Sequence, residues 1–158
     1  MSGLTHLDKS GRARMVDVSD KEASARTATA RGYLSCKAQT LANVRAGSTP
    51  KGSVVQTAEL AGIMAAKRTA ELVPLCHPLP LTMVAVQIEL DDELPGFGVT
   101  SEVRTRAETG VEMEALTAVS VACLTLFDML KAIYRTMVIG GIEVVSKTGG
   151  RSGNWRRE

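Results

Sequence analysis

The chain has 158 residues, of which 44% are hydrophobic and only 3% aromatic, and its formal net charge is +2. This length suits one domain with a core of aliphatic side chains. The near balance of charges and the scarcity of aromatic rings argue against non-specific nucleic-acid binding and against base stacking. The three cysteines, Cys36, Cys76 and Cys123, are odd in number and lack a Cys-x-x-Cys spacing. Neither a disulfide framework nor a zinc site is indicated, and a reducing cytoplasm fits best.

The two ends of the chain differ from its middle. Residues 1–14 are polar and basic without an apolar core, which excludes an ordinary secretory signal and predicts a flexible N-terminal tail. The longest uncharged apolar stretch, residues 115–127, is shorter than the roughly 20 residues that a membrane span needs. We therefore expect a single domain over residues 15–150, a flexible C-terminal tail over residues 151–158, and no membrane contact.

Side-chain patterns predict the first elements in chain order. Residues 24–36 alternate loosely between small or β-branched and polar side chains, which is typical of a strand. Ser35 can cap a short helix that continues through Val44 and ends at Gly47. From residue 53 to about residue 72, apolar side chains recur at helical spacing, which predicts a second helix.

Three prolines between residues 74 and 80 interrupt regular structure, so residues 75–77 should lie on a rigid, extended segment. Residues 84–90 and residues 99–107 then alternate with a period of two, as strands with one buried face do. The turn residues around Pro95 predict that these two strands form an antiparallel pair.

The last two predicted elements are a long helix and a strand. The helix covers roughly residues 113–134, and the apolar, β-branched residues 137–145 indicate a strand with a bulge or bend at Gly140 and Gly141. The order strand, helix, helix, strand, strand, helix, strand predicts an α+β fold with helices packed on one face of an antiparallel sheet. A ferredoxin-like arrangement is the first choice.

The long helix contains two charges that stand out. Asp128 and Lys131 are the only charged side chains between residues 115 and 133, and at a spacing of three they share a helix face. A helix this apolar should be buried in the core or in a subunit interface, where a carboxylate is costly unless it is paired. The two residues form either a structural ion pair or a proton-transfer couple.

At the start of the same helix, Glu112 and Glu114 are two residues apart, which in an extended backbone places both carboxylates on one side. Such a pair could share a proton or bind amino groups. The alternative is that acidic residues simply favour a helix N-terminus.

His77 is one of two histidines and follows Cys76 on the proline-stiffened segment. A fixed imidazole can bind ligands or exchange protons. Two adjacent ligands without distant Cys or His partners make a poor metal site, so no metal is expected there.

Lysines recur near the ends of the predicted elements. They are Lys51, Lys67, Lys131 and Lys147. A polyphosphate needs partners of this kind. Residues 147–153 could wrap an anion with backbone amides, but they lack P-loop spacing, and a basic glycine-rich tail is more often disordered.

Six segments, in order along nearly the whole chain, closely resemble the cyclic pyranopterin monophosphate synthase family, MoaC. They are Met15-Val16-Asp17-Val18-Ser19, Ala65-Ala66-Lys67-Arg68-Thr69, Leu75-Cys76-His77-Pro78-Leu79, residues 110–118, Phe127-Asp128-Met129 and Lys147-Thr148-Gly149-Gly150. The His-Pro segment combined with Gly-Val-Glu-Met-Glu-Ala-Leu is highly specific. Thr148 departs from the expected serine, but both residues carry a hydroxyl group.

The resemblance implies an activity and a set of site residues. The family converts 3′,8-cyclo-7,8-dihydro-GTP, made by a partner radical enzyme, into cyclic pyranopterin monophosphate as pyrophosphate leaves, by general acid/base chemistry. The implied catalytic group is Asp128, Lys131, Lys51 and His77. The implied substrate-binding residues are Leu75, Cys76, His77, Glu112, Met113 and Glu114, with Lys67 and Lys147 near the triphosphate.

From this resemblance we hypothesise that Asp128 orients Lys131 and tunes its pKa, with one of Lys51 and Lys131 acting as acid and the other as base. The resemblance also implies a homohexamer, a trimer of dimers, with active sites at subunit interfaces. No metal or other cofactor is expected. Whether Mg²⁺ accompanies the substrate triphosphate, the order of proton transfers and any contact with the radical enzyme stay open.

Two other classes of function compete with this interpretation. A small nucleic-acid-binding module would use Arg151, Arg156 and Arg157 and would bind RNA in a strongly salt-sensitive manner, but aromatic residues are too few. A catalytically silent oligomeric scaffold would explain the apolar helix, but it would not explain Asp128, His77 and the lysines.

Overall fold

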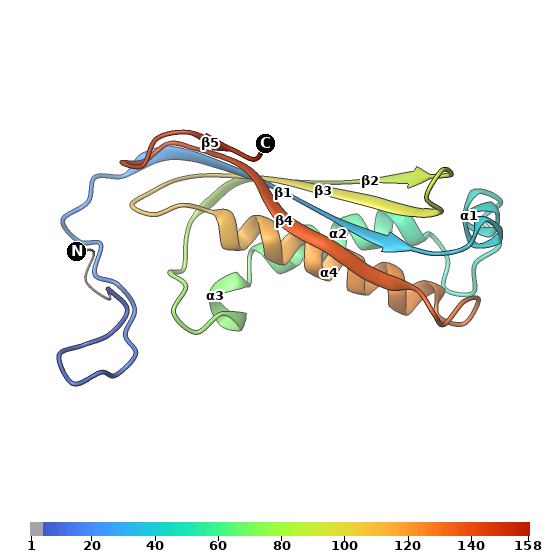
Figure 1. The fold of residues 1–158 in the computed structure, drawn as a ribbon, viewed down its shortest axis with the longest axis horizontal. Helices are drawn as coiled ribbons and strands as arrows, with labels where there is room; N and C mark the ends of the chain where they lie inside the picture. Colours follow the sequence, from blue (N-terminus) through green and yellow to red (C-terminus); the bar gives the residue numbers. More distant parts are fainter. Residues whose placement is uncertain (1–4) are drawn as a thin grey trace.

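The computed structural model describes residues 5–158 and consists of one antiparallel sheet with helices on one face (Figure 1). The strands are β1 (Ser24–Ser35), β2 (Leu81–Asp91), β3 (Gly96–Ala107), β4 (Val138–Thr148) and β5 (Trp155–Arg156). The helices are α1 (Ala38–Arg45), α2 (Val54–Ala66), α3 (Thr69–Leu72) and α4 (Glu112–Leu130). The strand order is β2-β3-β1-β4-β5, and every pair is antiparallel. The α+β prediction is confirmed, and the order of β1 to β4 is the split βαβ order of a ferredoxin-like sheet.

Three predicted helix boundaries were wrong. The helix expected over residues 53–72 is two helices, because the backbone leaves helical geometry at Arg68, whose N–H bonds only three residues back. Ser35 does not cap α1, because pairing with β4 extends through Ser35 and the N-cap is Lys37. The helix α4 ends at Leu130, and the chain continues in turns rather than to residue 134.

The bulge predicted in the last strand is confirmed. Along the β1 and β4 pair, Arg31 lies opposite Glu143 but Tyr33 lies opposite Gly140, so β4 contains one residue more than β1 over this interval. Gly141 has a φ of 63°, a left-handed conformation that glycine adopts without steric cost.

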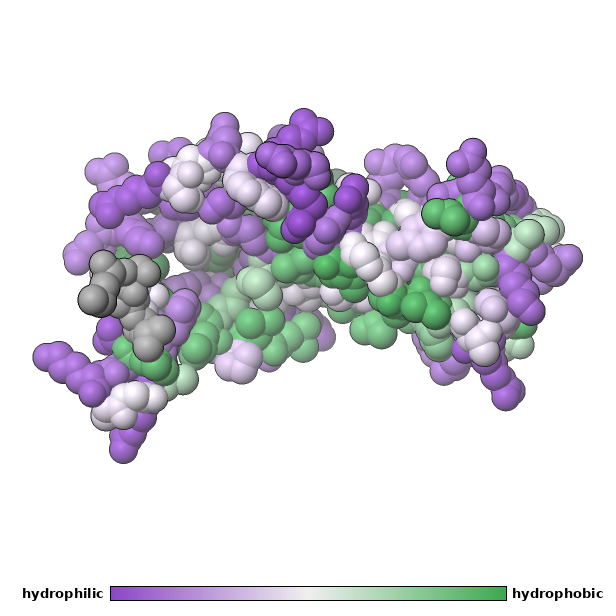
Figure 2. Space-filling model, viewed as in Figure 1, coloured by the Kyte–Doolittle hydropathy of each residue, from purple (hydrophilic) through white to green (hydrophobic). Residues whose placement is uncertain are grey.

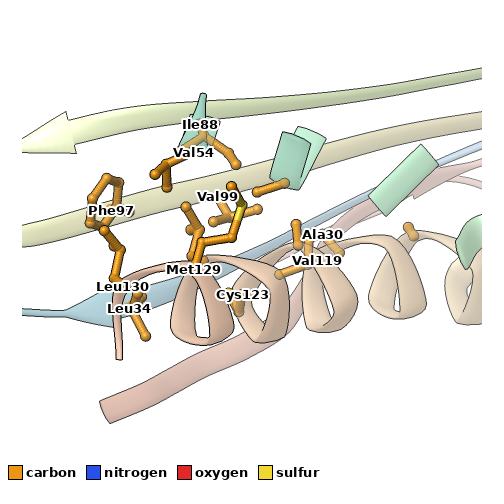
Figure 3. Packing of buried hydrophobic residues seen from close by; sticks show 14 of the residues in the cluster. Ala30, Leu34, Val54, Ile88, Phe97, Val99, Val119, Cys123, Met129 and Leu130 are labelled. Atoms are coloured by element: carbon orange, nitrogen blue, oxygen red, sulfur yellow. The ribbon is translucent and has the colours of Figure 1, made fainter. Parts of the chain in front are cut away.

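The core lies between the sheet and α4. Figure 3 shows side chains from β1 and β3, including Leu34 and Phe97, meeting Val119 and Leu130 of α4. Gly32 allows this close approach, since a Cβ at this position would lie 2.6 Å from Cγ1 of Val119. The alternation of small and aliphatic side chains on one face of each strand therefore positions α4 directly against the sheet.

The helix α2 packs beside α4, and the outer surface of this helix layer is partly apolar. A Cβ on Gly62 of α2 would lie 2.8 Å from the carbonyl oxygen of Ala118, so only glycine permits this spacing. On the outer surface, Leu60, Met64 and Leu124 are 57%, 51% and 58% exposed. Figure 2 shows hydrophobic side chains over the helix layer, in contrast to the hydrophilic upper side that carries β5.

Among the described residues, α4 is the one helix whose length and apolar composition would suit a membrane span. Half of the apolar stretch is buried against the rest of the fold, as in the core helix of a globular protein. Its sequence therefore reflects packing against the sheet and α2.

Both edges of the sheet have additional partners. At the β2 edge, the backbone N–H of Ile88 donates to Glu59 Oε1 of α2 at 3.1 Å. At the other edge, β5 pairs with β4, and the N–H of Arg157 donates to the carbonyl of Val145 at 2.8 Å. Two residues of the expected C-terminal tail thus form a strand, whereas residues 1–4 of the expected N-terminal tail lie outside the described residues.

Candidate active site

The predicted site residues lie mainly in two groups, at opposite ends of α4. Figure 1 shows the course of this helix. The first group, the Asp128 cluster, consists of Lys51, Asp128 and Lys131. The second group, the pocket cluster, lies near the first turn of α4 and consists of Leu75, Cys76, His77, Glu112, Met113, Glu114 and Lys147. Glu112 and Asp128 are sixteen positions apart, which at 1.5 Å per residue corresponds to about 24 Å along the helix.

In the Asp128 cluster, one carboxylate binds two ammonium groups. Oδ2 of Asp128 lies 2.7 Å from Nζ of Lys51, and Oδ1 lies 2.8 Å from Nζ of Lys131. The hydrogen bond from Lys131, followed by that from Lys51, lowers the pKa of Asp128 to about 2. Lys51 reaches Asp128 from the loop before α2, where Gly52 has a φ of 86°. The carboxylate therefore stays ionised at neutral pH and holds both lysines.

Of the two expected places of burial for Asp128 and Lys131, the core was wrong, since both side chains are 54% exposed in the single chain, and a subunit interface stays a prediction. Asp128 lies in the last turn of α4 and Lys131 directly after it, both on the exposed side, whereas Met129 and Leu130 between them are buried in the core. The apolar run that predicted burial is amphipathic in the fold, with its outer face uncovered.

Glu112 and Glu114 do not share one side, because the helix already begins at Glu112 and two helical positions differ by about 200°. Glu112 is half-buried and lies 3.3 Å from Nζ of Lys147, which also donates to Oγ of Ser152 at 2.8 Å. Gly110 leaves the space that the Glu112 carboxylate fills. The pair therefore joins the start of α4 to the glycine-containing loop after β4.

Glu114 points in a different direction and is only 3% exposed. Its Oε1 accepts a hydrogen bond from the Cys76 thiol at 3.6 Å, whereas Oε2 is buried without a partner among the described residues. Burial raises the pKa of Glu114. Burial, together with the Glu114 charge, also raises the pKa of Cys76 to about 11. The thiol is therefore protonated at neutral pH and is no ready nucleophile.

The remaining predicted residues surround this end of α4. His77 is half-buried, and its Nε2 lies 2.6 Å from the carbonyl oxygen of Val16. Leu75 is half-buried in the turn before it, and Met113 is 41% exposed. Lys67 is exposed at the C-terminal end of α2, and the structure gives it no ion pair within residues 5–158.

A cleft of about 750 Å³ opens beside Glu112 and Lys147. Arg26 also lines it, and its guanidinium donates to the carbonyls of Ala107 and Glu108, both at 3.0 Å. Arg26 was missed in the sequence, where the only signal was a charged side chain in a strand of small residues. Over the described residues, no three His, Cys, Asp or Glu side chains gather as metal ligands would.

The comparisons with known proteins identify the family of the chain. The model of the MoaC family matches residues 15–150. A cyclic pyranopterin monophosphate synthase of Cereibacter sphaeroides is 59% identical over 155 residues, which cover 98% of each chain. The synthase of a Nostoc species is 58% identical over 154 residues, covering 98% of this chain and 92% of the relative. Both the family model and the relatives extend over the fold and both groups of site residues, and the chain belongs to the MoaC family.

Proposed function

We propose that the chain is a cyclic pyranopterin monophosphate synthase, a cytoplasmic lyase of molybdenum cofactor biosynthesis. It would convert 3′,8-cyclo-7,8-dihydro-GTP into cyclic pyranopterin monophosphate and release pyrophosphate. The relatives bear this name, and the identity extends over nearly their whole length. The observation that carries the proposal is the Asp128 carboxylate, which holds one lysine on each oxygen at the end of an apolar helix.

The Asp128 cluster suits general acid/base chemistry. Because the pKa of Asp128 is about 2, this group cannot supply a proton near neutral pH, and its role is to orient two amines. One of Lys51 and Lys131 acts as the acid and the other as the base. Closure of the site around substrate would remove the water that now reaches these half-exposed side chains and would strengthen their electrostatic effect.

The pocket cluster suits binding of the nucleotide-derived substrate. Lys147 and Arg26 line the cleft and would contact the triphosphate, with Lys67 as a further expected contact. The buried Oε2 of Glu114 has no partner among residues 5–158 and would accept an N–H group of the guanine-derived ring. We expect no resident metal, and Mg²⁺ would enter only with the triphosphate.

A single chain cannot place one substrate against both groups, since about 24 Å of helix separates them. Two copies packed with their α4 helices antiparallel would place the Asp128 cluster of one protomer beside the pocket cluster of its partner. The exposed Leu60, Met64 and Leu124 on the outer helix surface suit burial in such a contact. We propose a homohexamer, a trimer of dimers, with active sites at subunit interfaces.

The first test is turnover of enzymatically prepared 3′,8-cyclo-7,8-dihydro-GTP, with pyrophosphate and the pterin product followed by mass spectrometry. Wild type should form product, and Asp128→Ala should not, although it should fold and assemble normally. Absence of product from a well-folded wild-type oligomer would contradict the proposed function and favour a scaffold role.

The second test addresses the shared site. Lys131→Met and Glu114→Gln should each be inactive alone, but refolding a mixture should restore roughly a quarter of wild-type activity, because random pairing leaves one intact site in half of the dimers. A mixture as inactive as its components would rule out the shared site. So would a monomer in size-exclusion chromatography with light scattering.

A further inference from the structure

The segment Met15–Ser19, which comes before the first strand, contacts His77 although the two are far apart in the chain. Nε2 of His77 lies 2.6 Å from the carbonyl oxygen of Val16, 61 positions away. A backbone carbonyl can only accept a hydrogen bond, so Nε2 must carry the proton. In a neutral imidazole the other nitrogen, Nδ1, is then an acceptor.

We propose that the segment Met15–Ser19 is a positioning segment that fixes the neutral His77 ring with its proton on Nε2, so that Nδ1 accepts from an N–H or O–H group of the substrate. The inference rests on the proposed function for the nature of the substrate, but the choice of tautomer is a property of the protein alone. No partner for Nδ1 is found within residues 5–158, so this nitrogen is available.

The opposite tautomer is disfavoured by the same contact. With the proton on Nδ1, the Nε2 lone pair would face the lone pairs of the Val16 carbonyl at 2.6 Å, and the ring would have to turn away. Partial burial limits how far the ring can turn, and Pro78 restricts the backbone of His77. The carbonyl therefore selects both the tautomer and the orientation of the ring.

A local turn at Asp17 fixes the backbone that directly follows Val16. Oδ1 of Asp17 accepts hydrogen bonds from the backbone N–H of Ser19 at 2.9 Å and from the Ser19 hydroxyl. These bonds lower the pKa of Asp17, so the turn persists at neutral pH. The next turn continues the support, since the N–H of Lys21 donates to the carbonyl of Val18 at 3.0 Å. The carbonyl group of Val16 is thus directed towards His77 by the consecutive turns that follow it.

Asp8 provides a matched control. Its Oδ1 accepts from the N–H and the hydroxyl of Ser10, at 2.8 and 2.6 Å, so it makes the same kind of turn. This turn lies at the end of the small hairpin in which Leu7 pairs with Ala13, away from His77. Asp8→Ala removes the same two kinds of bond as Asp17→Ala and also a bond from the N–H of Arg12 at 3.0 Å, but only Asp17→Ala should affect the ring.

The experiment reads the tautomer directly. Because His77 and His6 are the only two histidines, His6→Gln leaves a single imidazole to observe. Protein labelled with ¹⁵N-histidine is examined by magic-angle-spinning NMR at about pH 8.5, above the ordinary histidine pKa of about 6.5. We expect one neutral species with the proton on Nε2, unchanged by Asp8→Ala. Asp17→Ala, or a chain that begins at Ser19, should show a mixture of both tautomers.

The kinetic readout separates this inference from the proposed function. Asp17→Ala should lower kcat about tenfold with little change in KM, as expected for the loss of one orienting hydrogen bond, whereas Asp8→Ala should lower neither. A wild-type ring with its proton on Nδ1 would overturn the inference, as would an unchanged tautomer in both Asp17→Ala and the shortened chain. The expected tautomers without any turnover would leave the positioning segment intact and overturn only the proposed function.

Discussion

The two ends of α4 differ in the exposure and the pairing of their charged side chains. At the C-terminal end, Asp128 and two lysines are about half exposed, and all their charges are paired. At the N-terminal end, Glu114 is buried, one of its oxygens has no partner among residues 5–158, and burial raises its pKa. The charges at one end are therefore in contact with water, whereas the other end holds a buried acceptor.

The comparison shows how a small fold can hold incompatible environments. A buried acceptor and an exposed cluster of amines would disturb each other's pKa values if they shared one end of the helix. The separation of about 24 Å along α4 prevents this in the single chain. The substrate would bring the two environments together only in the assembled protein.

The largest effect is expected at the exposed end. Lys131→Met should lower kcat by about 10²- to 10⁴-fold, the usual contribution of a proton-transferring group. Its free energy of unfolding should change by only about 0.5 kcal/mol, because exposed ion pairs contribute little. Turnover and urea denaturation measure the two quantities, with Lys9→Met, an exposed lysine far along the chain, as control. Full turnover in Lys131→Met would refute the role of this cluster.

The second prediction concerns the packing of α2 against α4, the helix that separates the two ends. Gly62→Ala should destabilise the fold by about 1–3 kcal/mol, because the new methyl group would lie 2.8 Å from the Ala118 carbonyl of α4. In the absence of this contact, alanine in a helix would stabilise by up to about 1 kcal/mol. Chemical denaturation gives the sign of the change in the free energy of unfolding. A more stable variant would show that α2 and α4 separate easily.

The third prediction tests the buried end through pH. Because the folded pKa of Glu114 lies above its ordinary value of 4.5, the folded state holds a proton that the unfolded state has released between the two values. Stability therefore falls as pH rises through this interval. Glu114→Gln should lack this fall, whereas the exposed control Glu93→Gln should retain it. Thermal unfolding at a series of pH values provides the measurement, and parallel curves for wild type and Glu114→Gln would contradict a buried, titrating carboxyl group.

The smallest effect is expected at Cys76. Its pKa of about 11 means that little thiolate exists at neutral pH, so Cys76→Ser should lower activity by less than about tenfold. Iodoacetamide should label Cys76 slowly, and Glu114→Gln should speed the labelling because a negative charge is removed. Mass spectrometry of timed samples measures the rate. Rapid labelling of the wild-type residue would show a thiolate and would call for a nucleophilic role.

Much of the fold was predictable because alternation along β2 and β3 and the apolar periodicity of α4 are local patterns. The break between α2 and α3 was not predictable, because it depends on the backbone conformation of a single residue, Arg68. The divergence of Glu112 and Glu114 was missed for a similar reason, because the boundary of α4 decides which way each points.

The sequence predicts which residues belong to the site, but it predicts little of their geometry. The resemblance placed His77 in one catalytic group with Lys51, Asp128 and Lys131, but in the single chain His77 lies apart from the other three, against Val16. The contact between Lys51 and Asp128 spans 77 positions. No local pattern predicts that contact, the hydrogen bond between Val16 and His77, or the place of Arg26 in the cleft, because each depends on tertiary packing.

The partners at the sheet edges have a consequence for handling the protein. Open edge strands present free N–H and C=O groups that can recruit further chains into aggregates. Here the Glu59 carboxylate accepts a hydrogen bond from an N–H of β2, and the two residues of β5 pair with part of β4. We therefore expect that pairing with β5 protects part of β4 from contact with other chains. A shortened chain that ends before Trp155 should stay folded yet precipitate at lower concentration.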